Sequence, residues 1–367
     1  MARRQEQEPA RSEISEVGPG ILRMELPIRL PGLGHVNMYA LLDSEGAAVL
    51  DPGLPGPATW RAIQERLGQA GLRTKDVHTV LISHSHPDHF GCALRFQKEV
   101  GSKVIAHHRF SFGPVQASQG PEVSVDDLSA QRDREAAESG PPDAGPPDAG
   151  PPPAPVPWGG KTPWGGERPR PPLKRRIQWR FMKLLGKGFL PTITHPVEHG
   201  DELRLADREM FVLHTPGHTG DHFCLHDPET GILLAGDHVL PSITPHISGL
   251  SSSRDPLASF FYSLDRVAEI GGIGQVLPAH GHPFDDLRGR TEAIQRHHDE
   301  RLETVKEISR DFGKPATTRQ FSERLFAPRN WGSMADSETY AHLEHLRLLG
   351  QADRHEGPDG VPRYMAG

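Results

Sequence analysis

The feature that most constrains this chain is a cluster of histidines and an aspartate directly after a short apolar run. The run covers residues 79–82 (TVLI), which predicts a buried strand, and the cluster is the segment HSHPDH at residues 84–89. Neutral imidazole nitrogens and carboxylate oxygens are ligands that zinc and similar divalent ions prefer. His84 and His86 are two residues apart, so an extended chain directs both to one side, whereas Pro87 turns the chain. The segment therefore predicts a metal site at the end of a strand.

Three later segments also place a histidine or an aspartate after an apolar run. They are residues 211–218 (FVLHTPGH), 232–237 (ILLAGD) and 276–282 (VLPAHGH). Each predicts a strand that ends in a polar side chain. If these strand ends meet at one edge of a sheet, their side chains form a single metal site.

With these segments the chain resembles the metallo-β-lactamase superfamily, and the likeness covers roughly residues 17–290. Five motifs match in the expected order: Asp51, residues 84–89, His218, Asp237 and His280. The resemblance implies the fold of that superfamily, which is an α+β four-layer αββα sandwich.

The resemblance also implies two metal ions and a role for each matched residue. One ion would be held by His84, His86 and His218 and the other by Asp88, His89 and His280, with Asp237 bridging both. Asp51 would orient a ligand histidine. Two cations about 3.5–4 Å apart can share a water and supply hydroxide at neutral pH, so a metal-dependent hydrolase is implied. Asp88 would be both a ligand and the catalytic carboxylate that handles the proton, and the ions are expected to be zinc, with iron or manganese as alternatives.

Other histidines near these motifs are not expected to be ligands. His214 and His222 lie four residues on either side of a matched histidine and are expected to be supporting or core residues. His107 and His108 follow the apolar run at residues 103–106, which is expected to be an edge strand. We expect both to be solvated.

For five residues, a role other than the one implied by the resemblance, or a purely structural role, stays open. Asp51 stands before Pro-Gly and could be an ordinary turn residue. His238 and His282 each lie close after a matched ligand, so either could compete with it for the metal. Cys92 and Cys224 are too far apart to form a metal knuckle or a disulfide framework, and we expect both to be buried and unreactive.

The length and composition agree with a cytoplasmic enzyme, which is what we expect. The chain has 367 residues and a net charge of −7, which gives no global argument for binding nucleic acid. The N-terminus lacks the apolar segment of a signal peptide, and no run approaches the ~20 apolar residues that span a membrane. An exported antibiotic-hydrolysing enzyme is therefore disfavoured. Residues 1–16 are expected to be a disordered tail.

The chain is expected to contain one large domain and one small one. Residues 17–285 would form the metallo-β-lactamase domain, and residues 286–367 a helical, winged-helix-like domain. The sequence of the small domain predicts helices near residues 288–311, 317–325 and 337–349, and a hairpin over residues 351–365. Helices followed by a hairpin resemble the C-terminal appendage of one branch of the superfamily, whose members include glyoxalase-II-like hydrolases and endoribonucleases.

An insertion interrupts the large domain over about residues 113–172. It is rich in Pro and Gly and contains two copies of PWGG, so it is expected to be largely disordered. Residues 173–185 are basic, with apolar residues at helical spacing. They predict either a helix packed over the cleft as a lid or a docking surface for anionic partners.

Three functions compete. The favoured one is hydrolysis of a small ester, thioester or lactone, with a small molecule as the substrate. The second is a metal-dependent endoribonuclease, which the acidic net charge and the single basic stretch disfavour. The third is a non-catalytic interaction protein with a structural metal, which is disfavoured because every ligand position is filled. No membrane partner is expected, and a homodimer is left open.

Overall fold

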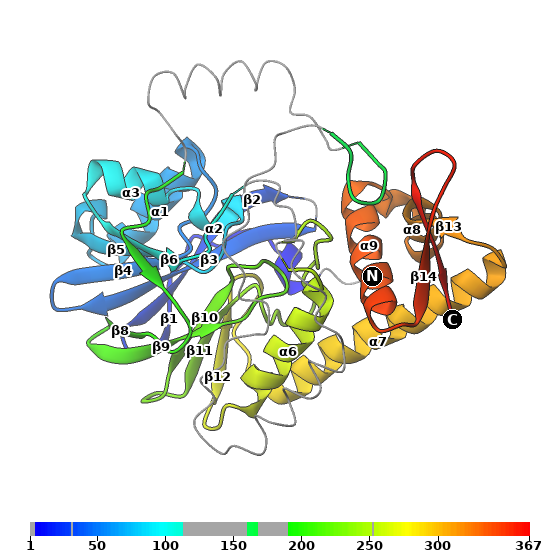
Figure 1. Cartoon of the computed structure of the whole chain (residues 1–367). Helices are drawn as coiled ribbons and strands as arrows, with labels where there is room; N and C mark the ends of the chain where they lie inside the picture. The colour runs from blue at the N-terminus through cyan, green and yellow to red at the C-terminus, as the bar shows by residue number, and fades with distance from the viewer. Residues whose placement is uncertain (1–3, 31, 113–159, 168–189, 252) are drawn as a thin grey trace.

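The computed structural model describes residues 4–30, 32–112, 160–167, 190–251 and 253–367. Their strands form two packed sheets and one small C-terminal sheet, with helices on the outer faces (Figure 1). The basic segment 173–185 lies outside the described residues. None of the described helices combines the length and the apolar character needed to cross a bilayer.

The first sheet has seven strands in sequence order. They are β1 (Ser15–Gly18), β2 (Ile21–Leu30), β3 (Leu33–Asp43), β4 (Gly46–Leu50), β5 (Val77–Ile82), β6 (Lys103–His107) and β7 (His195–Val197). Strands β1 to β4 pair antiparallel, whereas β4 to β7 pair parallel. Because parallel neighbours run in the same direction, β4 and β5 bring their carboxyl ends to the same edge of the sheet.

The second sheet has five strands in the order β12-β11-β10-β9-β8. They are β8 (Glu202–Leu205), β9 (Arg208–His214), β10 (Phe223–Asp227), β11 (Ile232–Gly236) and β12 (Gln275–Pro278). Only β11 and β12 pair parallel. These two strands therefore also end at a common edge.

Strand β5 shows why the apolar run before the histidine cluster has no polar alternation. Val80 and Ile82 are fully buried in the core beneath the helices of the first sheet, and Leu81 is fully buried in the core between the two sheets. A strand segment with both faces covered is apolar on both faces, so its sequence is a nearly continuous apolar run. Each such side chain stabilises the fold by roughly 1.5–3 kcal/mol.

Helices complete the four layers. The first sheet is covered by α1 (Pro57–Gln69), α2 (Pro87–Phe90) and α3 (Ala93–Glu99), and the second by α6 (Pro256–Glu269) and α7 (Leu287–Phe312). Trp60 of α1 and Phe96 of α3 are buried edge to face, with ring centroids 4.8 Å apart. The αββα sandwich expected from the sequence is confirmed.

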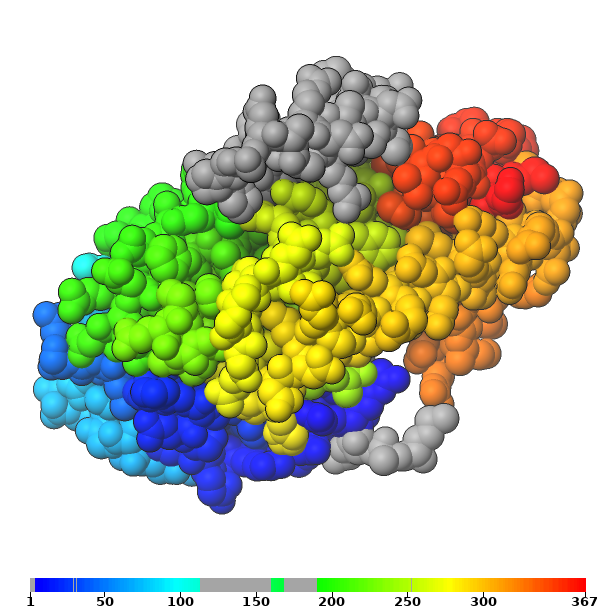
Figure 2. Space-filling model, turned by 90° about the horizontal axis from the view of Figure 1, so that it is seen from below, coloured from blue at the N-terminus to red at the C-terminus, as the bar shows by residue number. Residues whose placement is uncertain are grey.

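The C-terminal unit packs onto the far half of α7. It contains β13 (Ala316–Thr317), α8 (Thr318–Leu325), η3 (Pro328–Asn330), α9 (Ser333–Leu348), β14 (Ala352–Glu356) and β15 (Pro362–Ala366), with sheet order β13-β15-β14. One apolar core runs from Phe260 and Ile294 through Val305 to Phe321 and Tyr364. Figure 2 shows the yellow and orange segment that contains α7 as a continuous surface between the sandwich and the C-terminal unit. Helices and hairpin lie close to where the sequence predicts them, although α9 begins at Ser333 and not at residue 337, and the winged-helix form stays a prediction.

The expectation of a disordered tail over residues 1–16 is wrong for the part that the structure describes. The short helix η1 (Gln5–Gln7) lies against the loop after β11, and Glu6 is fully buried. Its carboxylate accepts hydrogen bonds from the backbone N–H groups of Ser242 and Ile243 at 2.7 and 3.1 Å. A polar segment can thus be fixed by hydrogen bonds, which composition alone does not reveal.

Part of the insertion expected to be disordered is ordered. Residues 160–167 form a turn closed by a bridge between Lys161 and Glu167. Trp164 is buried there against Tyr340 of α9, with ring centroids 5.3 Å apart. Hydrogen bonds from Thr162 to the carbonyl of Gly166 add to this aromatic contact in fixing the turn. Residues 113–159 and 168–172 lie outside the described residues.

Candidate metal centre

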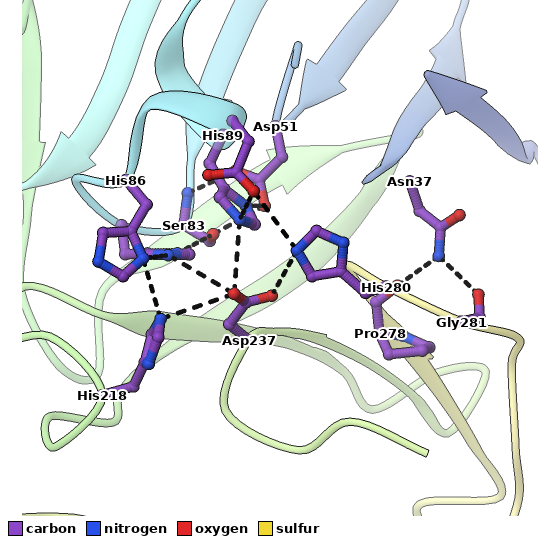
Figure 3. A network of polar contacts seen from close by, with 12 residues as sticks. Asn37, Asp51, Ser83, His86, His89, His218, Asp237, Pro278, His280 and Gly281 are labelled. Carbon is purple, nitrogen blue, oxygen red and sulfur yellow. Dashed lines mark hydrogen bonds and ion pairs between the residues drawn. The ribbon is translucent and has the colours of Figure 1, made fainter. Parts of the chain in front are cut away.

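Loops at the ends of strands from both sheets meet at one edge of the sandwich (Figure 3). The seven predicted ligands form two groups, one of His84, His86, His218 and Asp237 and one of Asp88, His89 and His280. Within each group, one ligand atom of each residue lies within 4.8 Å of the others. The structure therefore brings together every residue that the sequence proposes as a ligand.

Three imidazole nitrogens form the centre of the first group. His84 Nε2 and His218 Nε2 each lie 3.0 Å from His86 Nδ1. Ligand nitrogens around a tetrahedral zinc ion with bonds of about 2.0–2.1 Å are about 3.3 Å apart, so this spacing suits such an ion. Asp237 Oδ2 approaches the same nitrogens, at 3.6 Å from His218 and 3.9 Å from His84.

Ser83 and Asp51 decide which nitrogen of His84 faces the group. Asp51 accepts hydrogen bonds from the backbone N–H and the hydroxyl of Ser83, at 2.8 and 2.7 Å. Since that hydroxyl donates its proton to Asp51, its oxygen accepts Nδ1–H of His84 at 3.0 Å. The Nε2 atom of His84 is left as the bare nitrogen that a cation needs.

Oxygen acceptors fix three more imidazole rings in the same way. Nδ1–H of His89 donates to Asp51 at 2.9 Å, that of His218 to the carbonyl of His246 at 2.7 Å, and that of His280 to the carbonyl of His35 at 2.7 Å. Each of these oxygens can only accept, so each ring turns its Nε2 atom to the centre. Asp51 thus orients His89 directly and His84 through Ser83.

Asp237 stands between the two groups. In the second group, Asp88 Oδ2 lies 3.7 Å from His89 Nε2 and 3.6 Å from His280 Nε2. Asp237 Oδ1 lies 3.3 Å from His280 Nε2, and Asp237 Oδ2 lies 3.6 Å from His89 Nε2. Because Oδ2 also faces the first group, the side chain occupies the position expected of a bridging carboxylate (Figure 3).

Several nitrogen and oxygen atoms at the centre lack hydrogen-bond partners within the described part of the chain and could instead bind a cation. Among the described residues, His89 Nε2, His280 Nε2 and Asp237 Oδ1 are buried and have no hydrogen-bond partner. A buried polar atom without a partner costs about 1–3 kcal/mol. A divalent ion would satisfy all three, and the mixture of imidazole and carboxylate suits zinc, iron or manganese.

Burial and neighbouring charge set the protonation of the ligands. Burial lowers the pKa of His84 and His86 well below the usual histidine value, and their imidazole neighbours lower it further, so both rings are neutral at pH 7. Burial also opposes a charge on His89, but Asp237, Asp51 and Asp88 outweigh it and raise its pKa well above the usual value. The second group is therefore a place that favours positive charge.

Several supporting residues do not stand out in the sequence. His222, expected to be supporting or core, accepts the backbone N–H of Asp237 at 3.0 Å on Nε2 and hydrogen-bonds Thr215 Oγ1 through Nδ1 at 2.7 Å. Asn37 donates to the carbonyls of Pro278 and Gly281 and so holds the loop that carries His280 (Figure 3). Like Ser83, His35 and His246, Asn37 lies outside the motifs or acts through a backbone atom, which leaves no sequence signal.

Other histidines lie apart from both groups. His238 is buried 5.3 Å from the Phe260 ring, and His282 hydrogen-bonds the N-terminal segment through Glu8. Neither residue belongs to the two groups of ligand atoms. His107 is 2% exposed, and β6 lies between β5 and β7, so the expectations of a solvated ring and an edge strand are wrong.

The comparison with known families agrees with this centre. The chain matches the metallo-beta-lactamase superfamily over residues 31–286, which include all the motif residues. A probable metallo-hydrolase of Bacillus subtilis (strain 168), YqjP, is 25% identical over 346 residues, covering 88% of this chain and 91% of that protein. The human acyl-coenzyme A thioesterase MBLAC2 is 32% identical over 109 residues, but this segment spans only 37% of its length.

Solved structures extend the likeness to the whole chain. The metallo-beta-lactamase family protein TTHA1429 of Thermus thermophilus superposes with a TM-score of 0.68 and 28% identity, covering 96% of this chain and 100% of that one. A beta-lactamase domain protein of Burkholderia ambifaria has a TM-score of 0.67 and 24% identity, covering 97% of this chain and 95% of that one, which shows the fold. The family match spans more than half of the chain, and the fold and the ligand cluster are complete. The chain therefore belongs to the metallo-beta-lactamase superfamily and is a metal-dependent hydrolase.

Proposed function

We propose that this enzyme hydrolyses a small carboxylic ester, thioester or lactone, with two divalent ions held at the His/Asp cluster. The observation that carries the proposal is the pair of donor groups that share Asp237. Two ions about 3.5–4 Å apart would lower the pKa of a shared water, supply hydroxide at neutral pH and polarise the carbonyl under attack. A cysteine nucleophile is not required, and burial raises the pKa of both Cys92 and Cys224 to about 12.

The residues of the chain would hold the ions, orient the ligands and move a proton. His84, His86 and His218 would hold one ion and Asp88, His89 and His280 the other, with Asp237 between them. Asp51 keeps two of the rings in position before any ligand arrives, which limits reorganisation. Asp88 is the proposed catalytic residue, because its carboxylate faces the second group and can accept a proton from the attacking water. Zinc is the proposed metal, with iron and manganese as alternatives.

Two observations favour a small acyl substrate over RNA. The human relative is named an acyl-coenzyme A thioesterase, although the likeness covers 29% of this chain. The net charge of −7 gives no broad attraction for a phosphate backbone, whose binding needs clustered Lys and Arg. We therefore propose a small-molecule substrate and treat RNA cleavage as an outcome of the test.

The test is a side-by-side assay of the zinc-loaded protein. The substrates are an acyl-coenzyme A thioester, aryl esters, acyl lactones and single-stranded RNA, each with the parent protein and the Asp88→Ala variant. We expect turnover of at least one acyl substrate, reduced by at least about a hundredfold in Asp88→Ala, consistent with the loss of a proton-transfer group.

The Asp88→Ala variant is also the control for contaminating nucleases, which would cleave RNA equally in both preparations. RNA cleavage that is absent from Asp88→Ala, without turnover of any acyl substrate, would replace this proposal with the endoribonuclease. Acyl turnover that is equal in the parent and in Asp88→Ala would refute the assigned role of Asp88.

A further inference from the structure

The loop after β11 connects the metal centre with the C-terminal unit. Residues 238–250 contain no regular helix or strand. Within this loop, the carbonyl of His246 accepts Nδ1–H of His218 at 2.7 Å. Because an irregular loop lacks the hydrogen-bond pattern that fixes a helix or strand, contacts from outside must keep this carbonyl in place.

The first half of the loop is held by the N-terminal segment and by α7. Glu6 accepts the backbone N–H groups of Ser242 and Ile243. Arg290 of α7 donates to the carbonyls of Leu240 and Ile243, both at 2.6 Å. These bonds end three residues before His246.

The second half of the loop is held by α9 of the C-terminal unit. His246 Nδ1 lies 3.1 Å from Glu338 Oε2, and the hydroxyl of Ser337 accepts the backbone N–H of Gly249 at 3.0 Å. The contact is close: a Cβ atom at Gly249 would lie only 2.7 Å from the carbonyl oxygen of Ser337. The helix therefore fixes the loop on both sides of the carbonyl that His218 uses.

Glu338 is an ionised acceptor in this contact. Its side chain is 16% exposed, and its second oxygen lies 3.0 Å from Arg301 Nη1 on α7. Burial alone would raise the pKa of Glu338, but the bond to His246 and the charges of His246 and Arg301 hold it at about 2. Since a carboxylate can only accept, His246 carries its proton on Nδ1 and donates it.

We propose that Glu338 is a positioning residue for the metal centre, holding His246 so that its backbone carbonyl keeps the ring of His218 turned to the cluster. The inference rests on the proposed assignment of His218 as a ligand. It makes the C-terminal unit part of the metal site. Partners that orient a ligand histidine typically change metal affinity by about 10–100-fold when they are removed.

The experiment measures zinc affinity in the full-length, metal-stripped protein. Zn²⁺ is titrated in competition with a chromophoric chelator into the parent, Glu338→Ala, His246→Ala and the double variant. Glu344→Ala is the matched control, because this buried carboxylate of α9 accepts from Tyr364 and pairs with Arg347 inside the C-terminal unit. Thermal unfolding of each variant is recorded in parallel.

We expect Glu338→Ala to weaken one of two zinc-binding events by at least about tenfold, with the other event unchanged. His246→Ala keeps the carbonyl but loses the ring, so it should show the same loss, and the double variant should lose no more. Glu338→Gln keeps an acceptor oxygen and should recover most of the affinity. Glu344→Ala should bind both ions as the parent does, even if it unfolds at a lower temperature.

Two outcomes separate this inference from the site assignment. If His218→Ala loses one ion but Glu338→Ala and Glu338→Gln bind both as the parent does, Glu338 has no positioning role. If His218→Ala itself retains both ions with unchanged affinity, the ligand assignment fails first. Equal losses in Glu338→Ala and Glu344→Ala would show a general effect of destabilising α9 and would also overturn the proposal.

Discussion

At the scale of single residues, the proposed metal centre depends on oxygen acceptors as much as on its proposed ligands. Asp51, the hydroxyl of Ser83 and the carbonyls of His35 and His246 each take an Nδ1–H group and turn the opposite nitrogen inward. This arrangement fixes the rings before an ion binds, so little side-chain entropy remains to be lost on binding. The exception is His86, which presents Nδ1 itself to the first group.

The ligand assignment predicts different metal contents for single variants. We expect about two divalent ions per chain in the parent, one in His86→Ala and fewer than one in Asp237→Ala, because Asp237 faces both groups. Metal analysis after exhaustive dialysis measures this. His282→Ala, which changes a nearby histidine outside both groups, should retain the parent's metal. Full metal content in both ligand variants would exclude the assigned site.

At the scale of helices and strands, the sequence predicts the elements that have a regular residue pattern. It misses the segments that are held by contacts with distant residues. The buried strand β5, the helix α7 and the β14–β15 hairpin follow from apolar runs, periodicity and the GPDG turn. The cluster of proposed ligands follows from their position after apolar runs. The ordered N-terminal segment is held by contacts with residues far along the chain, such as those of Glu6 with Ser242, and the turn at residues 160–167 packs Trp164 against Tyr340. Local composition cannot show such contacts, because the partner is distant in the chain.

The contact of Trp164 with Tyr340 leads us to expect that the insertion has a dispensable and a structural part. Residues 120–157 are Pro- and Gly-rich, and we expect their deletion to leave the melting temperature and the metal content unchanged. Trp164→Ala should release the turn from Tyr340 and make it sensitive to protease. Limited proteolysis with mass analysis locates the cleavage. Loss of cooperative melting in the deletion variant, or no new cleavage in Trp164→Ala, would contradict this division.

The contact between α7 and α9 leads us to expect that the folded state loses stability in acid. His298 Nδ1 lies 3.1 Å from His342 Nε2, and burial lowers the pKa of His298 to about 2 and that of His342 to about 4. The folded state keeps both rings neutral, whereas the unfolded chain binds protons below about pH 6.5. The stability from these rings is therefore complete above pH 6.5 and is lost as the pH falls, down to about 4 for His342 and about 2 for His298.

For His342 alone, the loss between pH 6.5 and 4 is up to about 3 kcal/mol. Urea unfolding at several pH values measures the slope. His342→Gln, a neutral side chain of similar size, should flatten it, and His355→Gln on the exposed part of β14 should leave it as in the parent. Equal slopes in the parent and His342→Gln would show that the α7–α9 contact is not the acid-sensitive element.

At the scale of the whole molecule, α7 makes the sandwich and the C-terminal unit share one apolar core. The loop 238–250 joins the same two parts through polar contacts, from Glu6 on one side to Glu338 on the other. Two parts linked by a continuous core and by the loop whose His246 carbonyl contacts His218 have no weak boundary at which one could unfold alone.

We therefore expect a single calorimetric unfolding transition for the full chain. Zinc binding should raise the temperature of the whole transition. Binding at a hundred times the dissociation constant adds about 2.7 kcal/mol to the free energy of unfolding, which raises the transition temperature by several degrees. Fluorescence of Trp60 in the sandwich and of Trp164 and Trp331 at the C-terminal unit follows the two parts separately, in variants that keep only one of the five tryptophans of the chain at a time. If the C-terminal reporters melted first and did not respond to zinc or a chelator, the two parts would be independent, because a shared core makes their unfolding and their response to the metal inseparable.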